Sequence, residues 1–155
     1  MPRIDHSLLL LLLLFCCFFS ASCAAGDSVA IGETGSGVAP CPASPNCVSS
    51  QAQDADHQVE PLRFTVPAVD AWRILKEQLA KRPRTVIVTE KPGYLHAQSK
   101  SAVFGFVDDL EFYLRPAQGV IDVRFAARTG YSDFGVNRKR VEALRAAFRQ
   151  AGAAP

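Results

Sequence analysis

The chain has 155 residues and a formal net charge of +2, with 48% hydrophobic and 21% charged residues. Once an N-terminal leader is set aside, this length is enough for one domain. The small net charge argues against nucleic acid as a partner, because nucleic-acid-binding domains carry a strong basic excess.

Residues 1–24 are typical of an export signal. Arg3 supplies a positive start, residues 8–19 are an unbroken apolar run, and small residues follow at 20–25. This is the order of a secretory signal. The four residues that end at Cys23 resemble a bacterial lipobox, so we expect Cys23 to be lipidated and the protein to be a membrane-anchored lipoprotein facing the periplasm. Cleavage one or two residues further on, which would release a soluble exported protein, and an uncleaved signal anchor are the alternatives.

The segment after the signal predicts a linker and then a cross-linked loop. Residues 25–40 are rich in Gly, Ser and Ala and have no apolar period, which predicts a flexible linker. Beyond the leader the chain has only Cys41 and Cys47, in a loop stiffened by prolines. Two cysteines in an exported chain favour a disulfide, and their spacing is that of neither a zinc nor a redox motif. We therefore predict a structural bridge.

Hydrophobic periodicity predicts one α+β domain over residues 41–150. Period-two alternation and β-branched residues predict five strands, at residues 62–66, 85–89, 94–99, 107–114 and 120–127. Apolar residues at helical spacing predict helices over residues 67–83 and 137–150, followed by a frayed tail at residues 151–155. This order predicts an antiparallel sheet of about five strands with two helices packed on one face.

The last two predicted strands can be aligned residue by residue around a turn at residues 115–119, with Arg115 opposite Val120. One face then carries three apolar pairs, Leu110 with Phe125, Phe112 with Val123 and Leu114 with Ile121. The other face pairs Glu111 with Arg124 and also carries Asp109 and Arg128. A shift by one residue would set apolar against polar side chains, so this register is strongly favoured. We expect the apolar face to pack on the helices and the charged face to meet solvent or a cleft.

The loop before the last helix concentrates cationic and hydrogen-bonding side chains. Free backbone N–H groups at a helix start, together with cations, form a ready anion site. We predict a site for a phosphate, a carboxylate or an anionic lipid headgroup, formed by the charged face and this loop: Arg124, Arg128, Tyr131, Asn137, Arg138, Arg140, Asp109 and Glu111. In the alternative interpretation these cations pair with neighbouring carboxylates such as Asp108 and Asp133, and the cluster is structural.

Catalysis is a second hypothesis. His57 and His96 are the histidines beyond the leader, and either could act with Asp109 or Glu111 in a hydrolase. The sequence has no Gly-x-Ser-x-Gly elbow and no histidine pair at metal-ligand spacing, so we expect neither metal nor cofactor. We favour a non-catalytic module of the cell envelope, whose partners are the membrane and a small anionic ligand or another envelope protein. A purely structural module is the third hypothesis.

Several motifs in the mature region resemble a known family. They are Cys41–Ser50, the Asp56-His57 pair ahead of Pro61, Gly93–Ala97, Phe106–Phe112 and Gly130–Arg140. In this order they resemble the bacterial and plastid family called domain of unknown function 1499, over about residues 41–150. The resemblance implies a small exported or lipid-anchored domain, and it implies no particular reaction.

Overall fold

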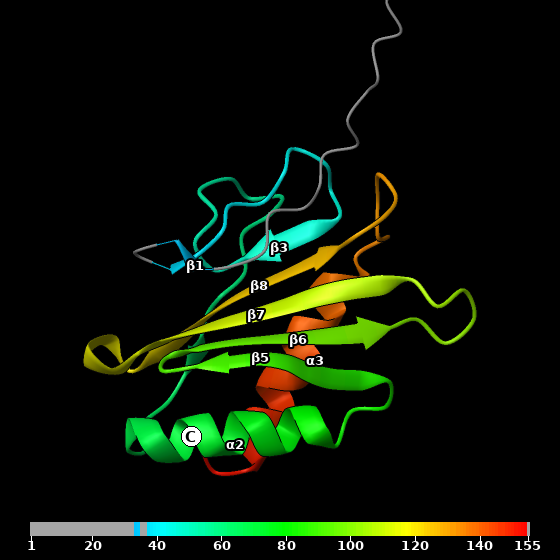
Figure 1. Cartoon of the computed structure of the whole chain (residues 1–155). Helices are drawn as coiled ribbons and strands as arrows, with labels where there is room; N and C mark the ends of the chain where they lie inside the picture. The colour runs from blue at the N-terminus through cyan, green and yellow to red at the C-terminus, as the bar shows by residue number, and fades with distance from the viewer. Residues whose placement is uncertain (1–32, 35–36, 155) are drawn as a thin grey trace, which may run out of the picture.

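The computed structural model of the chain describes residues 33–34 and 37–154 (Figure 1). The expected export signal and the expected lipidation site at Cys23 lie outside these residues. At the start of the described part, β1 (Glu33–Thr34) pairs with β2 (Gly37–Val38). Within the described part, no helix is both long and apolar enough to cross a membrane.

A six-stranded sheet forms the centre of the domain, and its named strands pair antiparallel. Five strands follow in the order β3 (Cys47–Ser49), β8 (Val120–Ala127), β7 (Val107–Arg115), β6 (Tyr94–Lys100) and β5 (Thr85–Lys91). The sixth, β4 (Leu62–Arg63), pairs with the first residues of β8. Helices α2 (Ala68–Ala80) and α3 (Val136–Gln150) lie on one side of the sheet (Figure 1). The predicted α+β class is confirmed, and β3 is a strand within a segment that was expected to be a loop.

The register predicted for the last hairpin is confirmed. Leu110 lies opposite Phe125, Phe112 opposite Val123, and Glu111 opposite Arg124. The apolar members are buried beneath the helices, and the rings of Phe112 and Phe125 meet edge to face at 5.5 Å. Each large apolar side chain buried in this way contributes about 1.5–3 kcal/mol, which is why the alternation fixes the register.

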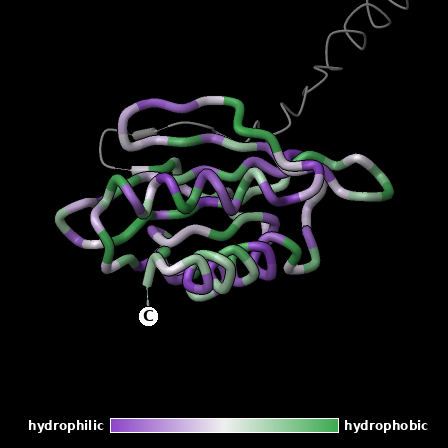
Figure 2. The backbone as a smooth tube through the Cα atoms, turned by 90° about the horizontal axis from the view of Figure 1, so that it is seen from below, coloured by the Kyte–Doolittle hydropathy of each residue, from purple (hydrophilic) through white to green (hydrophobic). Residues whose placement is uncertain are grey.

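Each helix buries one apolar stripe against this face. In α2 the stripe includes Ala71, Leu75 and Leu79, and in α3 it includes Leu144 and Phe148. Most residues between these apolar positions are polar, so hydrophilic and hydrophobic colours alternate along the helical turns of the tube (Figure 2). The helices therefore cover the apolar side of the sheet and leave the charged side to other elements.

The two segments that were expected to be loose at the ends of the domain belong in part to the fold. The linker expected over residues 25–40 ends early, because Val38 and Ala39 are buried. The tail expected at residues 151–155 is docked, since Ala153 is buried and its carbonyl accepts the N–H of Thr65 at 3.0 Å. Hydrogen bonds that hydropathy does not reveal hold both segments: the N–H of Val38 donates to the side-chain oxygen of Gln51 at 3.2 Å, and Ala153 is held through its backbone.

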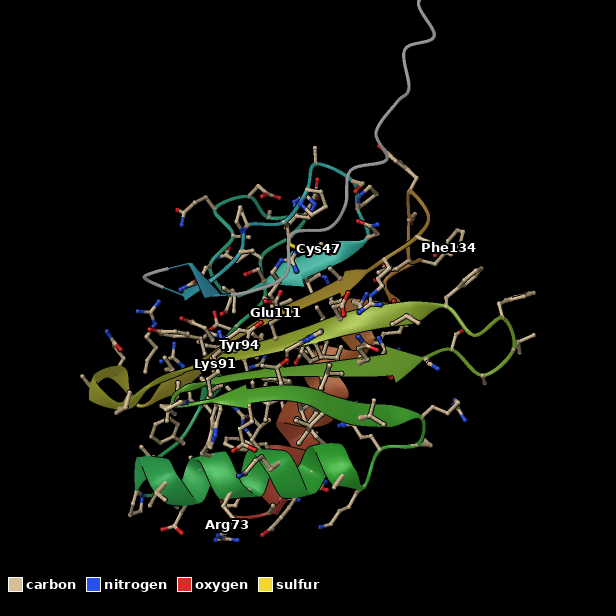
Figure 3. All side chains as sticks on the ribbon, in the orientation of Figure 1. Cys47, Arg73, Lys91, Tyr94, Glu111 and Phe134 are labelled. Carbon is tan, nitrogen blue, oxygen red and sulfur yellow. A yellow bond between two sulfur atoms is a disulfide. The ribbon has the colours of Figure 1, made fainter. Side chains whose placement is uncertain are left out.

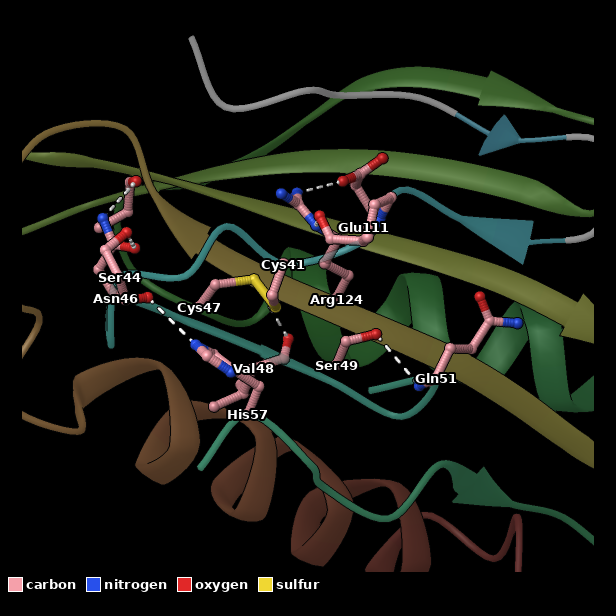
Figure 4. The surroundings of a disulfide bond; sticks show 12 residues. Cys41, Ser44, Asn46, Cys47, Val48, Ser49, Gln51, His57, Glu111 and Arg124 are labelled. Carbon is pink, nitrogen blue, oxygen red and sulfur yellow. Dashed lines mark hydrogen bonds and ion pairs between the residues drawn. A yellow bond between two sulfur atoms is a disulfide. The ribbon is translucent and has the colours of Figure 1, made fainter. Parts of the chain in front are cut away.

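The predicted disulfide between Cys41 and Cys47 is confirmed (Figure 4). Cys47 lies in β3, where it faces Ala126 of β8. The bridge therefore ties the segment at residues 37–41 to the edge of the sheet, on the side away from the helices.

Candidate functional site

The charged face of the sheet is buried, which corrects the expectation that it meets solvent or a cleft. Arg124 donates from Nη1 to Oε2 of Glu111 at 2.7 Å, and neither side chain is exposed. The hydroxyl of Tyr94 donates to the other oxygen of Glu111 at 2.8 Å. Arg124 also donates from Nε to the carbonyl of Pro40 at 3.3 Å. The segment at residues 37–41, held by the disulfide, thus covers this ion pair (Figure 4).

Asp109 is the second anchor of this buried layer. Arg128 donates to both of its oxygens at 2.8 Å, and Nε2 of His96 lies 2.7 Å from Oδ1. Burial raises the pKa of Asp109, but the hydrogen bonds from Arg128 and His96 outweigh burial and hold that pKa below its ordinary value. Asp109 is therefore a fixed anion that orients its neighbours.

This geometry gives the hydrolase hypothesis little support. His96 does lie within hydrogen-bond reach of a carboxylate, but it is buried and lines none of the cavities described below. His57 hydrogen-bonds Asp54, at 2.6 Å, and the carbonyl of Ser44, at 3.2 Å, so it holds two loops together. In the described part of the chain, no three His, Cys, Asp or Glu side chains gather in a way that could ligate a metal.

The start of α3, expected to bind an external anion, is occupied by a carboxylate of the chain itself. Asp133 accepts the backbone N–H of Gly135 at 2.9 Å and that of Asn137 at 2.9 Å. The helix therefore begins after Gly135 rather than at a cap formed by Asn137. A negative side chain at this end satisfies free N–H groups and favours the helix dipole.

The two helix arginines of the predicted site also have acceptors within the protein. Arg138 donates to the carbonyls of Asp56 and Gln58, both at 2.7 Å. Arg140 donates to Asp108 at 2.7 Å and to the side chain of Asn137 at 2.6 Å. Burial raises the pKa of Asp108, and Arg140 opposes that rise only in part. These arginines fasten the loops and the helix to each other.

The side chains that the sequence analysis grouped as an anion site do form a cluster of charges. In the structure, however, their hydrogen bonds go to other groups of the same chain. Seven of the eight predicted site residues hydrogen-bond within the chain: Asp109, Glu111, Arg124, Arg128, Asn137, Arg138 and Arg140. The eighth, Tyr131, is 77% exposed. It lies in the loop between β8 and α3, beside a different feature.

That feature is an apolar groove between the β6–β7 loop, residues 101–106, and the β8–α3 loop, residues 128–135. Its walls are Phe104, Phe106, Phe134 and Val136, and its volume is about 410 Å³. Ala127, Gly130 and the carboxylates of Asp108 and Asp133 also line it. Both loops lie at the same end of the sheet (Figure 1), and the loop that protrudes farthest at that end is largely hydrophobic (Figure 2). The volume lies within the usual range of ligand cavities, roughly 300–1,000 Å³.

The aromatic side chains of the groove are exposed. Phe104 is 75% exposed and stacks on Phe106 with 5.5 Å between ring centroids. Phe134 is 89% exposed and projects at the outer edge of the molecule (Figure 3). Water contact at three neighbouring phenylalanines is unfavourable, and exposed apolar patches of this kind are typical of interaction sites.

The backbone at Phe134 is also strained. Its φ is 53°, in the left-handed region, which costs a residue with a Cβ about 1–2 kcal/mol. Asp133 and Gly135 on either side are held by the carboxylate contacts at the start of α3. A strained backbone at Phe134 therefore holds an aromatic ring in solvent. Strain and exposure at the same residue point to a functional role.

A second cavity, of about 350 Å³, adjoins the groove and shares Ser101 and Val136 with it. We call it the cationic pocket, because four cations line it and no acidic residue does: Arg82, Arg84, Lys100 and Arg140. Arg84, like Phe134, has a left-handed backbone, with φ of 55°. These two are the non-glycine residues of positive φ in the described chain, and one lines each cavity.

Sequence reasoning missed both cavities, although each left a signal. Two phenylalanines flank Gly105 in a connection between strands, where polar residues are the rule. A basic run ends at Arg84 directly after α2. Neither signal reveals that three loops far apart in the sequence meet at one end of the sheet.

Comparison with known proteins identifies the family. The family model described as "Protein of unknown function (DUF1499)" matches residues 37–148, so the chain belongs to this family. The match begins at β2 and includes the covering segment, the disulfide and both cavities. Among curated proteins and solved structures, none matches the chain.

Proposed function

We propose that this member of the DUF1499 family is a non-catalytic binding module of the cell envelope that holds an alkyl chain in the apolar groove. The observation that carries the proposal is Phe134, a ring that is 89% exposed on a strained backbone at the groove wall. Closing the groove over a chain would remove this ring and Phe104 from water. That removal supplies a driving force of about 25 cal/mol per Å² of apolar surface.

Three properties of the groove support a lipid chain as its occupant. The walls are aromatic and aliphatic, which suits a flexible hydrocarbon. The volume of about 410 Å³ has room for roughly a dozen groups of the size of a water molecule, which suits one chain. The two carboxylates that line the groove, Asp108 and Asp133, are bonded to Arg140 and to backbone N–H groups of the chain. The adjoining pocket adds cations, and these complement the anionic headgroups of envelope lipids.

Binding of an uncharged amphiphile tests this proposal. The core residues of the described part lie between Val38 and Ala153, so the leaderless chain of residues 26–155 contains every element that the structure describes. We expect dodecyl maltoside, titrated calorimetrically below its micelle concentration, to bind this chain, and Phe134→Ser or Phe104→Ser to weaken binding about tenfold or more. Val69→Ser is the matched control, since Val69 is 76% exposed on α2 and lies outside the groove. Equal binding by wild type and Phe134→Ser would rule the groove out.

Export and anchoring complete the proposal. The leader pattern, the lipobox-like residues before Cys23 and a disulfide, which persists in oxidising compartments, support an envelope location. We expect the wild-type chain in the membrane fraction with the added mass of a lipid, and Cys23→Ala without that mass. Recovery of unprocessed wild-type protein from the cytosol would contradict export.

A further inference from the structure

We infer that the cationic pocket is the headgroup subsite of the same ligand, so that the protein binds an amphiphile with one alkyl chain and a phosphate-type anionic head. This inference rests on the proposed function of the apolar groove and adds the headgroup to it. Of the four cations of this pocket, the sequence analysis suggested Arg140 alone. Its basis is the environment of Arg82, Arg84 and Lys100.

Arg82 is a cation without an ion-pair partner among the described residues. Its Nε is shielded from solvent and has no hydrogen-bond partner among the described residues. A buried donor that is left unpaired is unfavourable, and native structures seldom leave one without a reason. Burial and the neighbouring Arg140 both lower the pKa of Arg82, yet an arginine stays charged in proteins. An anion in the pocket would supply the missing acceptor and relieve the repulsion between the two guanidinium groups.

Two further cations of the pocket, Arg84 and Lys100, are also free of carboxylates among the described residues. Arg84 donates from Nε to the carbonyl of Lys100 at 3.2 Å, and the N–H of Lys100 returns a bond to the carbonyl of Arg84 at 2.9 Å. This pair of bonds clamps the turn after α2 against the end of β6. Arg82, Arg84 and Lys100 form no ion pair with any described residue. By contrast, Arg140 has Asp108. The pocket thus presents uncompensated positive charge on a rigid frame.

The two cavities together match the shape of an amphiphile. Ser101 and Val136 line both of them, so a ligand that fills the groove with its chain has its head at the cations. A phosphate monoester suits this pocket because its oxygens accept charge-assisted hydrogen bonds from several cations at once. A trimethylammonium head has no acceptor for Arg82, and an uncharged sugar head offers only neutral acceptors, whose hydrogen bonds are weaker than those of a phosphate.

The contributions of the headgroup and of the alkyl chain are separated by measuring the affinity of the leaderless chain for four probes. These are dodecyl phosphate, dodecyl maltoside, dodecyltrimethylammonium and inorganic phosphate. We expect dodecyl phosphate to bind at least tenfold more tightly than dodecyl maltoside, since a hydrogen bond to a charged group is worth roughly tenfold or more in affinity. Dodecyltrimethylammonium should bind weakest. Arg82→Gln should remove the advantage of dodecyl phosphate and leave dodecyl maltoside unchanged, whereas Phe134→Ser should weaken both. Arg73→Gln, on the outer surface of α2, is the control for loss of one positive charge.

The possible failures are distinct. Equal affinity of wild type for dodecyl phosphate and dodecyl maltoside would overturn the headgroup subsite and leave the groove proposal standing. If inorganic phosphate binds as tightly as dodecyl phosphate, the pocket takes a free anion and the amphiphile is wrong. The groove proposal itself fails if wild type binds neither dodecyl phosphate nor dodecyl maltoside. It also fails if Phe134→Ser binds both of these compounds as tightly as wild type does. Arg82→Gln breaks no bond within the described protein, so its folding, checked by thermal unfolding, should match that of wild type.

Discussion

Arg124 and Glu111 form an ion pair with no exposed surface: Nη1 of the arginine lies 2.7 Å from Oε2 of the glutamate, between adjacent strands. The segment at residues 37–41 covers this pair, and Arg124 also donates a hydrogen bond to the carbonyl of Pro40 in that segment. Two charges out of water are tolerated here because each has a partner. The Arg124–Glu111 pair therefore stabilises the fold only when both charged side chains are present.

Removal of one partner of this pair should be costly. Arg124→Met removes the guanidinium that pairs with the buried carboxylate of Glu111, and we expect the free energy of unfolding in urea to fall by about 3–5 kcal/mol. The double variant Arg124→Met, Glu111→Gln should lose less than Arg124→Met alone, because no buried charge is then left unpaired. A double variant that loses the full sum of the two single losses would contradict the pairing.

Acid should weaken the fold through Asp109. Its folded-state pKa lies below the ordinary value, so the stability that it contributes is present above the unfolded-state pKa, about 3.9. That stability is lost as the pH falls through the folded-state pKa. We expect the free energy of unfolding to decline below about pH 5, and Asp109→Asn to show a shallower decline. Identical slopes for the two proteins would refute this role.

Asp108 supplies a control of opposite sign. Its folded-state pKa is raised, so its contribution is present at low pH and is lost as the pH rises through that value. Asp108→Asn should therefore steepen the loss of stability in acid. Both variants remove one carboxylate from adjacent positions of β7, so a general effect of charge would move both slopes in the same direction.

The disulfide should matter for the covering segment. Replacement of both cysteines by Ser, at Cys41 and Cys47, removes a short covalent loop, and we expect a loss of about 2 kcal/mol in the free energy of unfolding. The loss should come with faster amide hydrogen exchange at Val38 and Ala39, which the bridge holds over the ion pair. If exchange at these two amides is unchanged, the bridge does not hold the segment in place.

Replacement of Phe134 by glycine should raise the stability of the fold and weaken the binding of an amphiphile. Phe134→Gly relieves a left-handed backbone while giving up little packing, because the ring is 89% exposed. We expect it to raise the free energy of unfolding by about 1 kcal/mol and to weaken the binding of dodecyl maltoside. Phe134→Ala keeps the strain and should weaken binding without the gain in stability. A Gly variant that is less stable than the Ala variant would contradict the strain.

Local pattern explains why the fold was predictable. The register of the β7–β8 hairpin follows from strict alternation, which leaves one way to bury Leu110 and Phe125 together. The helices follow from their apolar stripes in the same way. The docking of Ala153 could not be predicted, because it depends on a backbone hydrogen bond to Thr65 that no side-chain pattern encodes.

The candidate site was less predictable, for a physical reason. The charges of Asp109, Glu111 and Arg124 were correctly placed on one face, but their burial depends on a covering segment without hydrophobic periodicity. The groove and the cationic pocket exist only because Arg84, Phe104 and Phe134 come from three loops that meet at one end of the sheet. The proximity of these three loops is set by the tertiary structure and is not encoded in any local sequence pattern.

The most direct measurement of the central claim is a nuclear magnetic resonance titration of the leaderless chain with dodecyl phosphate. Transferred contacts should appear between protons of the alkyl chain and the rings of Phe104, Phe106 and Phe134, and the Nε–H resonance of Arg82 should shift as the phosphate accepts it. That result would place the chain in the apolar groove and the head in the cationic pocket. Contacts to other surfaces, with these rings and Arg82 unaffected at saturation, would contradict the account.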